Sequence, residues 1–278
     1  MTTLTMFAFA GNSLLSRQAL SDPSNDPISF TCLRLASGAI VLLPLIFRRH
    51  GNKSSLQLNL RSFFLPAMLF SYALCFSISY VGLAAGTGAL ILFGSVQFTM
   101  IVVDYLMGKR LSKYEFLGFA VAFLGLIYIL IPGLHAPPIL SASLMALAGI
   151  SWGLYSVFGR GLVDPSLSTA KNFSLTIPFV LIALLIRPFH LNASGTYLAI
   201  ISGSVTSGLG YVLWYKTLKG LQVSTAAIVQ LSVPIIAASL GLLILGEPIS
   251  HRILIAGAMV IGGIFIKIKG GPSKAEKR

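Results

Sequence analysis

Two short stretches place a tryptophan among hydroxyl-bearing residues at helical spacing. In SWGLYSVFGR, Trp152, Tyr155 and Ser156 stand at i, i+3 and i+4, so a helix presents them on one face. The stretch YVLWYK repeats the pattern with Tyr211, Trp214 and Tyr215. Indole and phenol rings form a polarisable wall with hydrogen-bonding tips, which suits a flat aromatic or bulky apolar ligand and attracts an ammonium group. For Trp214, next to Lys216, anchoring in the membrane interface is the alternative.

Other polar side chains fall inside apolar stretches and are candidates to meet the polar end of a ligand. A polar side chain in hydrocarbon is costly unless it faces protein, water or a ligand. Asn12 and Ser16 stand four residues apart, and bonding between packed helices is the alternative role for them. Tyr80 suits an interfacial aromatic belt equally well. The candidate binding set outside the two aromatic stretches is Asn12, Ser13, Ser16, Tyr72, Ser79, Tyr80, Gln97 and Gln230.

Arg34 and Asp104 are the charged residues that fall within apolar runs. The Arg34 side chain has three options: it snorkels to the lipid headgroups, pairs with a protein group such as a carbonyl, or binds a substrate carboxylate. Structural pairing is our expectation. Asp104 lies close to Lys109, which indicates snorkelling or a salt bridge, with proton coupling as the minority alternative. The other acidic residues and the histidines fall in loops, helix ends or the tail, so no proton relay is evident inside the apolar runs. If the chain moves a solute, this favours facilitated, gradient-driven movement.

The elements that must carry these residues are membrane-spanning helices. Of the 278 residues 55% are hydrophobic and only 10% are charged, with a mean hydropathy of +0.87, whereas soluble domains carry about 25% charged residues. A spanning helix needs about 20 apolar residues. We therefore expect an all-α integral membrane protein with ten transmembrane helices at 2–20, 28–47, 63–82, 87–106, 114–132, 141–160, 170–187, 195–216, 224–245 and 251–268.

The positions of the basic residues predict the orientation. Sixteen of the 20 Lys and Arg residues fall in one set of alternate loops and the C-terminal tail, and three fall in the other set. Because basic loops stay in the cytoplasm, both termini are expected there. The basic residues that give the net charge of +13 then lie on the cytoplasmic side, facing anionic lipid headgroups, so no nucleic-acid partner is expected.

An internal repeat appears when the chain is shifted by 138 residues. The segment 87–112 then lies on 225–250, with Gly108 on Gly246 and Ser112 on Ser250. The repeat predicts two five-helix halves, 1–134 and 135–270, followed by a short basic cytoplasmic tail at 271–278. Because five is odd, the second half enters the membrane from the opposite side, as in secondary transporters that work by alternating access. The alternative is a duplication that merely built a stable bundle.

Three stretches carry a family resemblance. LILGEPIS (243–250) resembles the Leu-x-x-Gly-Glu signature of the drug/metabolite transporter superfamily, in its EamA-type ten-helix branch. The stretches FTCLRLASGAIVLL, with its early arginine, and TAAIVQLSVPIIAASL, with Pro234, also resemble this branch. The first half departs from it, with Val96 opposite Pro234 and Lys109 opposite Glu247. The resemblance implies export or exchange of small metabolites through a central cavity lined by both halves, and the nearest group is the aromatic amino-acid exporters of bacterial inner membranes (the YddG type). The structural or coupling candidates are Arg34, Asp104, Pro234, Gly246 and Glu247.

The expected function is secondary export of small metabolites, foremost aromatic and other neutral amino acids, across the inner (cytoplasmic) membrane of a bacterium. The expected partners are this small-molecule substrate and the lipid bilayer, while the oligomeric state stays open and a monomer is compatible with the sequence. There is no Gly-x-x-x-x-Gly-Lys-Ser/Thr loop, no metal-ligand cluster and no nucleophile–base pair, so we expect no ATP hydrolysis, enzyme activity, metal or cofactor. The alternatives are a multidrug or cationic-amphiphile exporter, which would favour a membrane-embedded glutamate, and a non-transporting scaffold or lipid-binding subunit.

Overall fold

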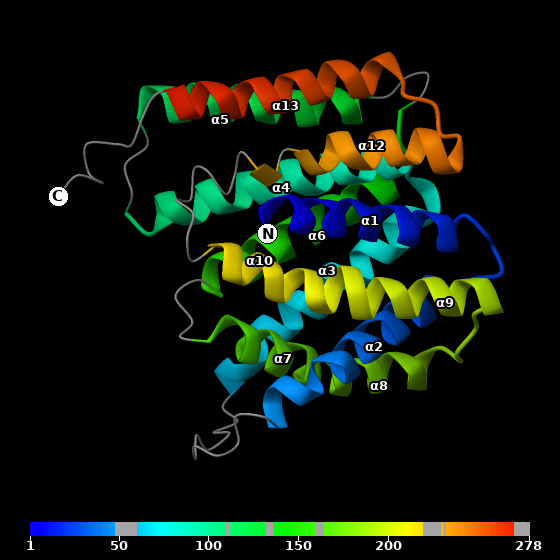
Figure 1. Cartoon of the computed structure of the whole chain (residues 1–278). Helices are drawn as coiled ribbons and strands as arrows, with labels where there is room; N and C mark the ends of the chain where they lie inside the picture. The colour runs from blue at the N-terminus through cyan, green and yellow to red at the C-terminus, as the bar shows by residue number, and fades with distance from the viewer. Residues whose placement is uncertain are drawn as a thin grey trace.

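The computed structural model describes residues 1–47, 60–108, 112–131, 136–159, 164–218, 229–230 and 232–269. Within these residues the chain forms helices and no strands. Successive long helices run in alternate directions and stack in layers, with α2, α3 and α6 inclined to the others, and α1 begins at the end of the bundle where α13 ends (Figure 1). The elements are α1 (Thr2–Leu20), α2 (Pro27–Phe47), η1 (Leu60–Phe63), α3 (Phe64–Gly82), α4 (Ala85–Leu106), α5 (Lys113–Leu130), α6 (Ile139–Phe158), α7 (Pro165–Leu175), α8 (Ile177–Ile186), α9 (Ala193–Ile201), η2 (Ser202–Leu209), α10 (Gly210–Leu218), α12 (Ser232–Leu245) and α13 (His251–Lys269).

The outer surface of the bundle suits hydrocarbon rather than water. Large apolar side chains such as Leu185, Ile186 and Leu243 are strongly exposed, and such surfaces on a water-soluble protein promote aggregation. Among the described residues, six helical stretches are long and apolar enough to cross a membrane, at Pro27–Phe47, Phe64–Gly82, Ala85–Leu106, Ile139–Phe158, Pro165–Ile186 and Ala193–Thr217.

Helix α1 carries several polar side chains, and its position in the bundle explains how they are accommodated. It runs through the middle of the bundle, between the layer of α4 and α12 and the layer of α9 and α10 (Figure 1). Asn12, Ser13 and Ser16 are buried there. The polar groups therefore face protein instead of lipid, where each would be costly.

Most predicted helix boundaries agree with the structure within two residues, and the differences lie in the second half of the chain. The helix predicted at 170–187 begins earlier, as α7, because the Asp164 carboxylate caps the amides of Ser166 and Leu167 at 3.1 and 3.2 Å and Pro165 suits the first turn. The helix predicted at 195–216 comprises α9, the π-helical segment η2 and α10. Several predicted positions lie outside the described residues, namely 132, 160, 224–228 and 231 of predicted helices and the predicted tail at 271–278.

Candidate functional site

Five buried aromatic side chains meet in the centre of the bundle, and we call them the aromatic cage. Its members come from α1, α3, α6 and α10, and each is at most 5% exposed: Phe9, Tyr72, Trp152, Tyr211 and Trp214. The Trp152 ring centroid lies 4.5 Å from that of Tyr211 and 4.9 Å from that of Tyr72, and Phe9 packs against Trp214 at 5.6 Å. Trp214 is therefore enclosed by protein and does not anchor the chain in the membrane interface.

The cage encloses a small cavity. Its walls come from α1, α3, α4, α6 and α10, and the volume open to the centre of a water molecule is about 10 Å³, close to the minimum that holds one water. A ligand with an aromatic ring enters only after the rings or the helices move apart. The residues that line the cavity are Phe9, Asn12, Tyr72, Phe76, Leu92, Phe93, Trp152 and Tyr211.

Arg34 lies directly behind the tyrosines of this cavity. Its guanidinium, 1% exposed, donates from Nε to Ser207 Oγ at 3.0 Å and from Nη2 to the hydroxyls of Tyr72 at 3.3 Å and Tyr211 at 3.1 Å. It also stacks over the ring of Phe76, 4.9 Å from the centroid. The side chain therefore does not snorkel to the lipid headgroups, and it pairs with hydroxyl groups of α3, η2 and α10.

The π-helical segment η2 supplies the remaining hydroxyls of the site. Three of them lie near Asn12 Oδ1, at 2.6 Å for Ser202, 3.3 Å for Thr206 and 3.4 Å for Ser207. Ser202 and Ser207 donate to it, whereas the Thr206 hydroxyl lies closer to the Ser202 carbonyl, at 2.9 Å. Ser202 and Ser207 are five residues apart, the spacing of a π-helical turn, and such turns are frequent at functional sites. Together with Asn12, Arg34 and the Tyr72 and Tyr211 hydroxyls, these three residues form what we call the polar cluster.

Gly203 allows η2 to approach α2 closely. A Cβ atom added to Gly203 would collide with the carbonyl oxygen of Arg34 and with Ser37 Oγ. The close contact between the two backbones brings Ser207 within hydrogen-bonding distance of the Arg34 guanidinium. The glycine is required because no space is left for a side chain. Backbone conformation is not the reason, since the φ of Gly203 is not positive.

An ion pair joins the two halves of the sequence at the end of the bundle where α1 ends, which we call the Leu20 end. Arg17 Nε lies 2.8 Å from Glu247 Oε1, and Arg17 Nη1 donates to the Tyr80 carbonyl at 3.0 Å. Glu247 Oε2 accepts from the Ala85 amide at 2.7 Å. Gly246, at φ +66°, ends α12 in the left-handed region that glycine favours and so directs Glu247 back toward α1.

The loops at the Leu20 end are also hydrogen-bonded across the two halves. Asn192 donates from its amide nitrogen Nδ2 to Asp22 at 2.8 Å and from its backbone to Asn25 Oδ1 at 2.9 Å. Hydrogen bonds from the backbone and hydroxyl of Ser24, and then from Asn192, lower the pKa of Asp22. The turn between α1 and α2 is thereby tied to the segment that begins α9.

Several candidate residues lie outside the cage. The Tyr80 hydroxyl donates to the Ala85 carbonyl at 3.3 Å and is fully buried, so Tyr80 does not belong to an interfacial belt. Ser79 donates to Cys75 of its own helix. Tyr155 accepts from Asn172 through its hydroxyl at 3.2 Å and from Tyr215 through its carbonyl at 3.1 Å. Four further candidates are buried without lining the cavity, namely Ser13, Ser16, Ser156 and Gln230, and Pro234 is buried in α12.

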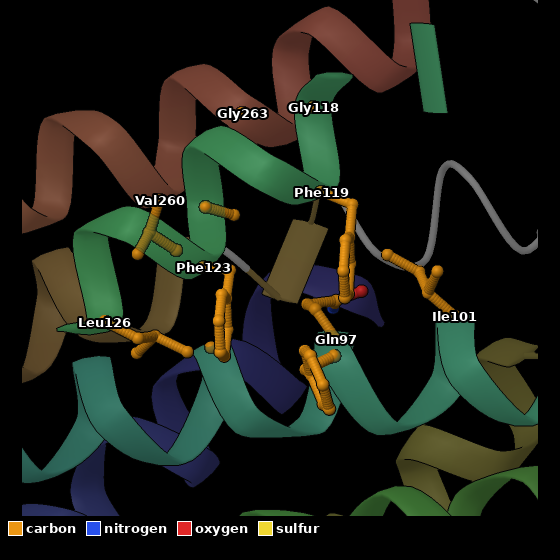
Figure 2. Close-up of a pocket in the computed structure, with 11 residues that line it drawn as sticks. Gln97, Ile101, Gly118, Phe119, Phe123, Leu126, Val260 and Gly263 are labelled. Carbon is orange, nitrogen blue, oxygen red and sulfur yellow. The ribbon is translucent and has the colours of Figure 1, made fainter. Parts of the chain in front are cut away.

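Gln97 borders a different cavity, between α4, α5 and α13. Phe119 and Phe123 of α5 extend over α4 toward Gln97, and Val260 and Gly263 of α13 close the far side (Figure 2). The volume open to a water centre is about 20 Å³. Asp104, two turns further along α4, is half-buried. Neither Gln97 nor Asp104 lines the cavity of the aromatic cage.

Sequence reasoning missed Phe9, Phe76 and the three hydroxyls of η2. Phe9 stands three residues before Asn12, so a helix places the two on one face, and this spacing was a usable signal. Ser202 and Thr206 stand four residues apart, a spacing that also places two side chains on one helix face. Nothing in the local sequence indicates that Arg34 lies opposite Ser207, because the two residues belong to different helices.

Comparisons with known proteins agree with a membrane transporter. The sequence profile described as "EamA-like transporter family" matches residues 1–131 and 139–268. An uncharacterized protein of Pseudomonas aeruginosa is 47% identical over 95% of this chain and 92% of its own length. A "probable amino-acid metabolite efflux pump" of Salmonella typhimurium is 25% identical over 83% of each chain. A protein of known crystal structure, 18% identical, shares the fold with a TM-score of 0.67 over 95% of this chain and 97% of its own. The chain is a multi-pass membrane protein that belongs to the EamA-like transporter family.

Proposed function

We propose that this protein is a secondary transporter that exports aromatic and other neutral amino acids from a bacterial cell by alternating access. The observation that carries the proposal is the aromatic cage, which residues of both sequence halves build around one central cavity. Indole and phenol rings hold a flat side chain by stacking and edge contacts. The relative described as an amino-acid metabolite efflux pump supports this substrate class.

Repeated local features support two halves, 1–134 and 135–270, with five spans each. Gly108 and Gly246, 138 residues apart, are the two glycines with positive φ among the described residues, at +91° and +66°. Ser112 and Ser250, also 138 apart, each accept a hydrogen bond from the amide three residues later, at 3.2 and 3.3 Å. The family profile likewise matches the chain twice.

The packing of the helices supports an inverted arrangement of these halves. Helix α1 packs on α12 and on α9 to α10, and α6 packs on α4 and on α3 in the corresponding way. Helices α5 and α13 pack on each other, with Gly125 against Met259 and Gly263 against Gly118. Such pairing is expected of two halves related by a two-fold axis in the membrane plane. With α1 beginning and α13 ending at one end of the bundle, the charge distribution assigns that end to the cytoplasm.

Alternating access needs contacts that form and break as the halves move. In this orientation the Leu20 end faces the cell exterior, and the Arg17–Glu247 ion pair links α1 of the first half to the end of α12 in the second. The pair therefore holds the exterior end closed. An exporter must break it to release its substrate, and the closed cage then opens toward that side.

A cationic-amphiphile exporter fits the site less well. Such a substrate favours an acidic group near the cavity, and no acidic residue lines the cavity within the part of the chain that the structure describes. The buried guanidinium of Arg34 repels a cation. We therefore favour substrates that carry a carboxylate.

The test is counterflow of labelled phenylalanine in proteoliposomes, with and without a pH gradient. We expect uptake into vesicles preloaded with phenylalanine, and at least about a tenfold loss in Trp152→Ala, since removing a buried aromatic anchor commonly costs 2 kcal/mol or more. Tyr197→Ala is the matched control, because Tyr197 is 68% exposed. The lack of flux for every amino acid tested would refute the proposal and favour a scaffold or lipid-binding role.

A further inference from the structure

Arg34 carries a buried charge that no carboxylate balances. The Arg17–Glu247 pair is the salt bridge found among the described residues, and the partners of Arg34 are hydroxyl groups and aromatic rings. Nη1 of Arg34 is buried and has no hydrogen-bond partner in the described part of the chain. A guanidinium stays protonated in proteins, and an unpaired buried charge is strongly unfavourable. An anionic ligand would relieve this cost.

The polar cluster also holds more donors than acceptors. The Tyr72 hydroxyl oxygen accepts from Arg34 at 3.3 Å, from Asn12 Nδ2 at 3.4 Å and from the Tyr211 hydroxyl at 3.2 Å. The proton of Tyr72 itself has no acceptor among the residues that the structure describes. Asn12 Oδ1, the amide acceptor of the cluster, already receives the hydroxyls of Ser202 and Ser207. The cluster thus offers one positive charge and at least one free hydroxyl proton, and carboxylate oxygens accept both.

The cluster lies against the cavity of the aromatic cage. Tyr72, Tyr211 and Asn12 line the cavity and belong to the cluster, and Phe76 lines the cavity beneath the Arg34 guanidinium. A ligand whose ring lies among Trp152, Tyr72 and Phe9 can therefore direct a carboxylate toward Arg34. For an ammonium group the described lining offers no carboxylate. It offers aromatic faces, which attract cations weakly compared with a carboxylate partner, and the oxygens of Asn12, Tyr72 and Tyr211, which already accept hydrogen bonds within the polar cluster.

We propose that Arg34, with the Tyr72 hydroxyl, binds the carboxylate of the substrate, and that the protein recognises aromatic monocarboxylates with or without an amino group. The inference rests on the proposed transport function, but the range of ligands differs: it excludes amino-acid derivatives that lack a carboxylate and includes acids that lack an amino group. Amino-acid amides and arylalkyl amines are rejected, because they bring no anion to Arg34. Arylalkanoates such as 3-phenylpropionate bind, because the amino group has no dedicated partner.

Intrinsic fluorescence offers a binding assay that does not require flux. The chain has two tryptophans, and both Trp152 and Trp214 belong to the cage, so a ligand there changes their emission. We would titrate the purified full-length protein with 3-phenylpropionate, phenylalanine and phenylalaninamide. We expect the two acids to bind within about threefold of each other and the amide to bind at least tenfold more weakly.

The deciding variant is Arg34→Met, which keeps the length of the side chain and removes its charge. We expect binding of both acids to weaken about 30-fold or more, as for loss of a buried charged partner, while binding of the amide stays within threefold of the wild type. A merely structural role for Arg34 predicts that acids and amide weaken together. Arg34→Lys is expected to restore part of the preference for acids, and Tyr72→Phe to reduce it. Arg252→Met is the matched control, because Arg252 donates to backbone carbonyls of Tyr128 and Ile131, outside the cage.

The outcomes separate this inference from the proposed function. Equal binding of acid and amide by the wild type, or no response to any carboxylate, overturns the role of Arg34, whatever the flux assay gives. The same holds if Arg34→Met keeps the wild-type ratio of acid to amide. Binding of 3-phenylpropionate that depends on Arg34, together with no counterflow of amino acids, refutes only the proposed substrate class. Should Arg34→Met fail to fold, the wild-type ratio and the Arg34→Lys and Tyr72→Phe variants carry the test.

Discussion

The ion pair at the Leu20 end makes the proposed exterior closure testable through the single substitution Glu247→Gln. The glutamate accepts on both oxygens, from Arg17 Nε at 2.8 Å and from the Ala85 amide at 2.7 Å. A glutamine has one acceptor and one donor group, so it can satisfy only one of these two donors. A hydrogen bond to a charged group contributes about 1.5–3 kcal/mol. The side chains of Arg17 and Glu247 are 23% and 14% exposed, so solvent screening favours the low end of that range.

A loss of about 1.5 kcal/mol changes the ratio of closed to open conformations roughly tenfold. The change can be measured as the labelling rate of a cysteine that replaces the buried Ser16, one residue before Arg17, with a membrane-impermeant maleimide added outside. Cys32 and Cys75 are buried and would be replaced by alanine. We expect Glu247→Gln and Arg17→Gln each to speed labelling about tenfold, and the double variant to add little, since the partners act as a unit.

The control and the refuting result follow from the same geometry. Asp164→Asn removes a carboxylate that caps α7, away from the Leu20 end, and should leave the rate of Ser16→Cys labelling unchanged. An unchanged or slower rate in Glu247→Gln would refute the view that this pair holds the exterior end closed. Fully additive effects of the two single substitutions would mean that Arg17 and Glu247 act independently.

Two further predictions concern backbone positions. Gly203→Ala should destabilise the purified protein by about 2 kcal/mol or more, because the new methyl group collides with the Arg34 carbonyl. Gly262→Ala is the control and should be neutral or slightly stabilising, because a methyl group there meets nothing within 4 Å. Equal unfolding temperatures for the two variants would contradict this prediction. Gly108→Ala and Gly246→Ala should each cost about 1 kcal/mol, because an L-residue is strained at positive φ even in open space. Unequal losses in thermal unfolding would weaken the case that these glycines end equivalent helices.

The extent of the helices could be predicted well from the sequence. Long apolar runs broken by polar, proline or glycine residues are local signals, and a span in a membrane must satisfy its backbone hydrogen bonds within the segment. The spacing of Trp152 and Tyr155 on one helix face is of the same kind, and the two rings do stack, at 5.4 Å. The π-helical segment η2 was not predicted, and its close contact with α2 at Gly203 joins residues far apart in the sequence, which local patterns do not reveal.

The rotation of each helix about its own axis could not be predicted from one sequence. Gln97 and Tyr72 looked alike as polar residues in apolar runs, yet Gln97 borders the cavity beside α5 and α13, and Tyr72 belongs to the cage and lines its cavity. For Trp214, interfacial anchoring and burial were equally consistent with the local pattern, and only its contact with Phe9 decides for burial. The role of a helix face depends on which neighbouring helix packs against it.

The sequence alone determined that the chain consists of apolar helices long enough for a membrane, because this property depends on composition and on residues close together in the chain. Tertiary structure decided which polar groups meet. Arg17 pairs with a residue 230 positions away, and Arg34 pairs with hydroxyls 38 and 177 positions away. Such contacts follow from which helices are adjacent and which faces they share, and this is settled only when the whole bundle packs.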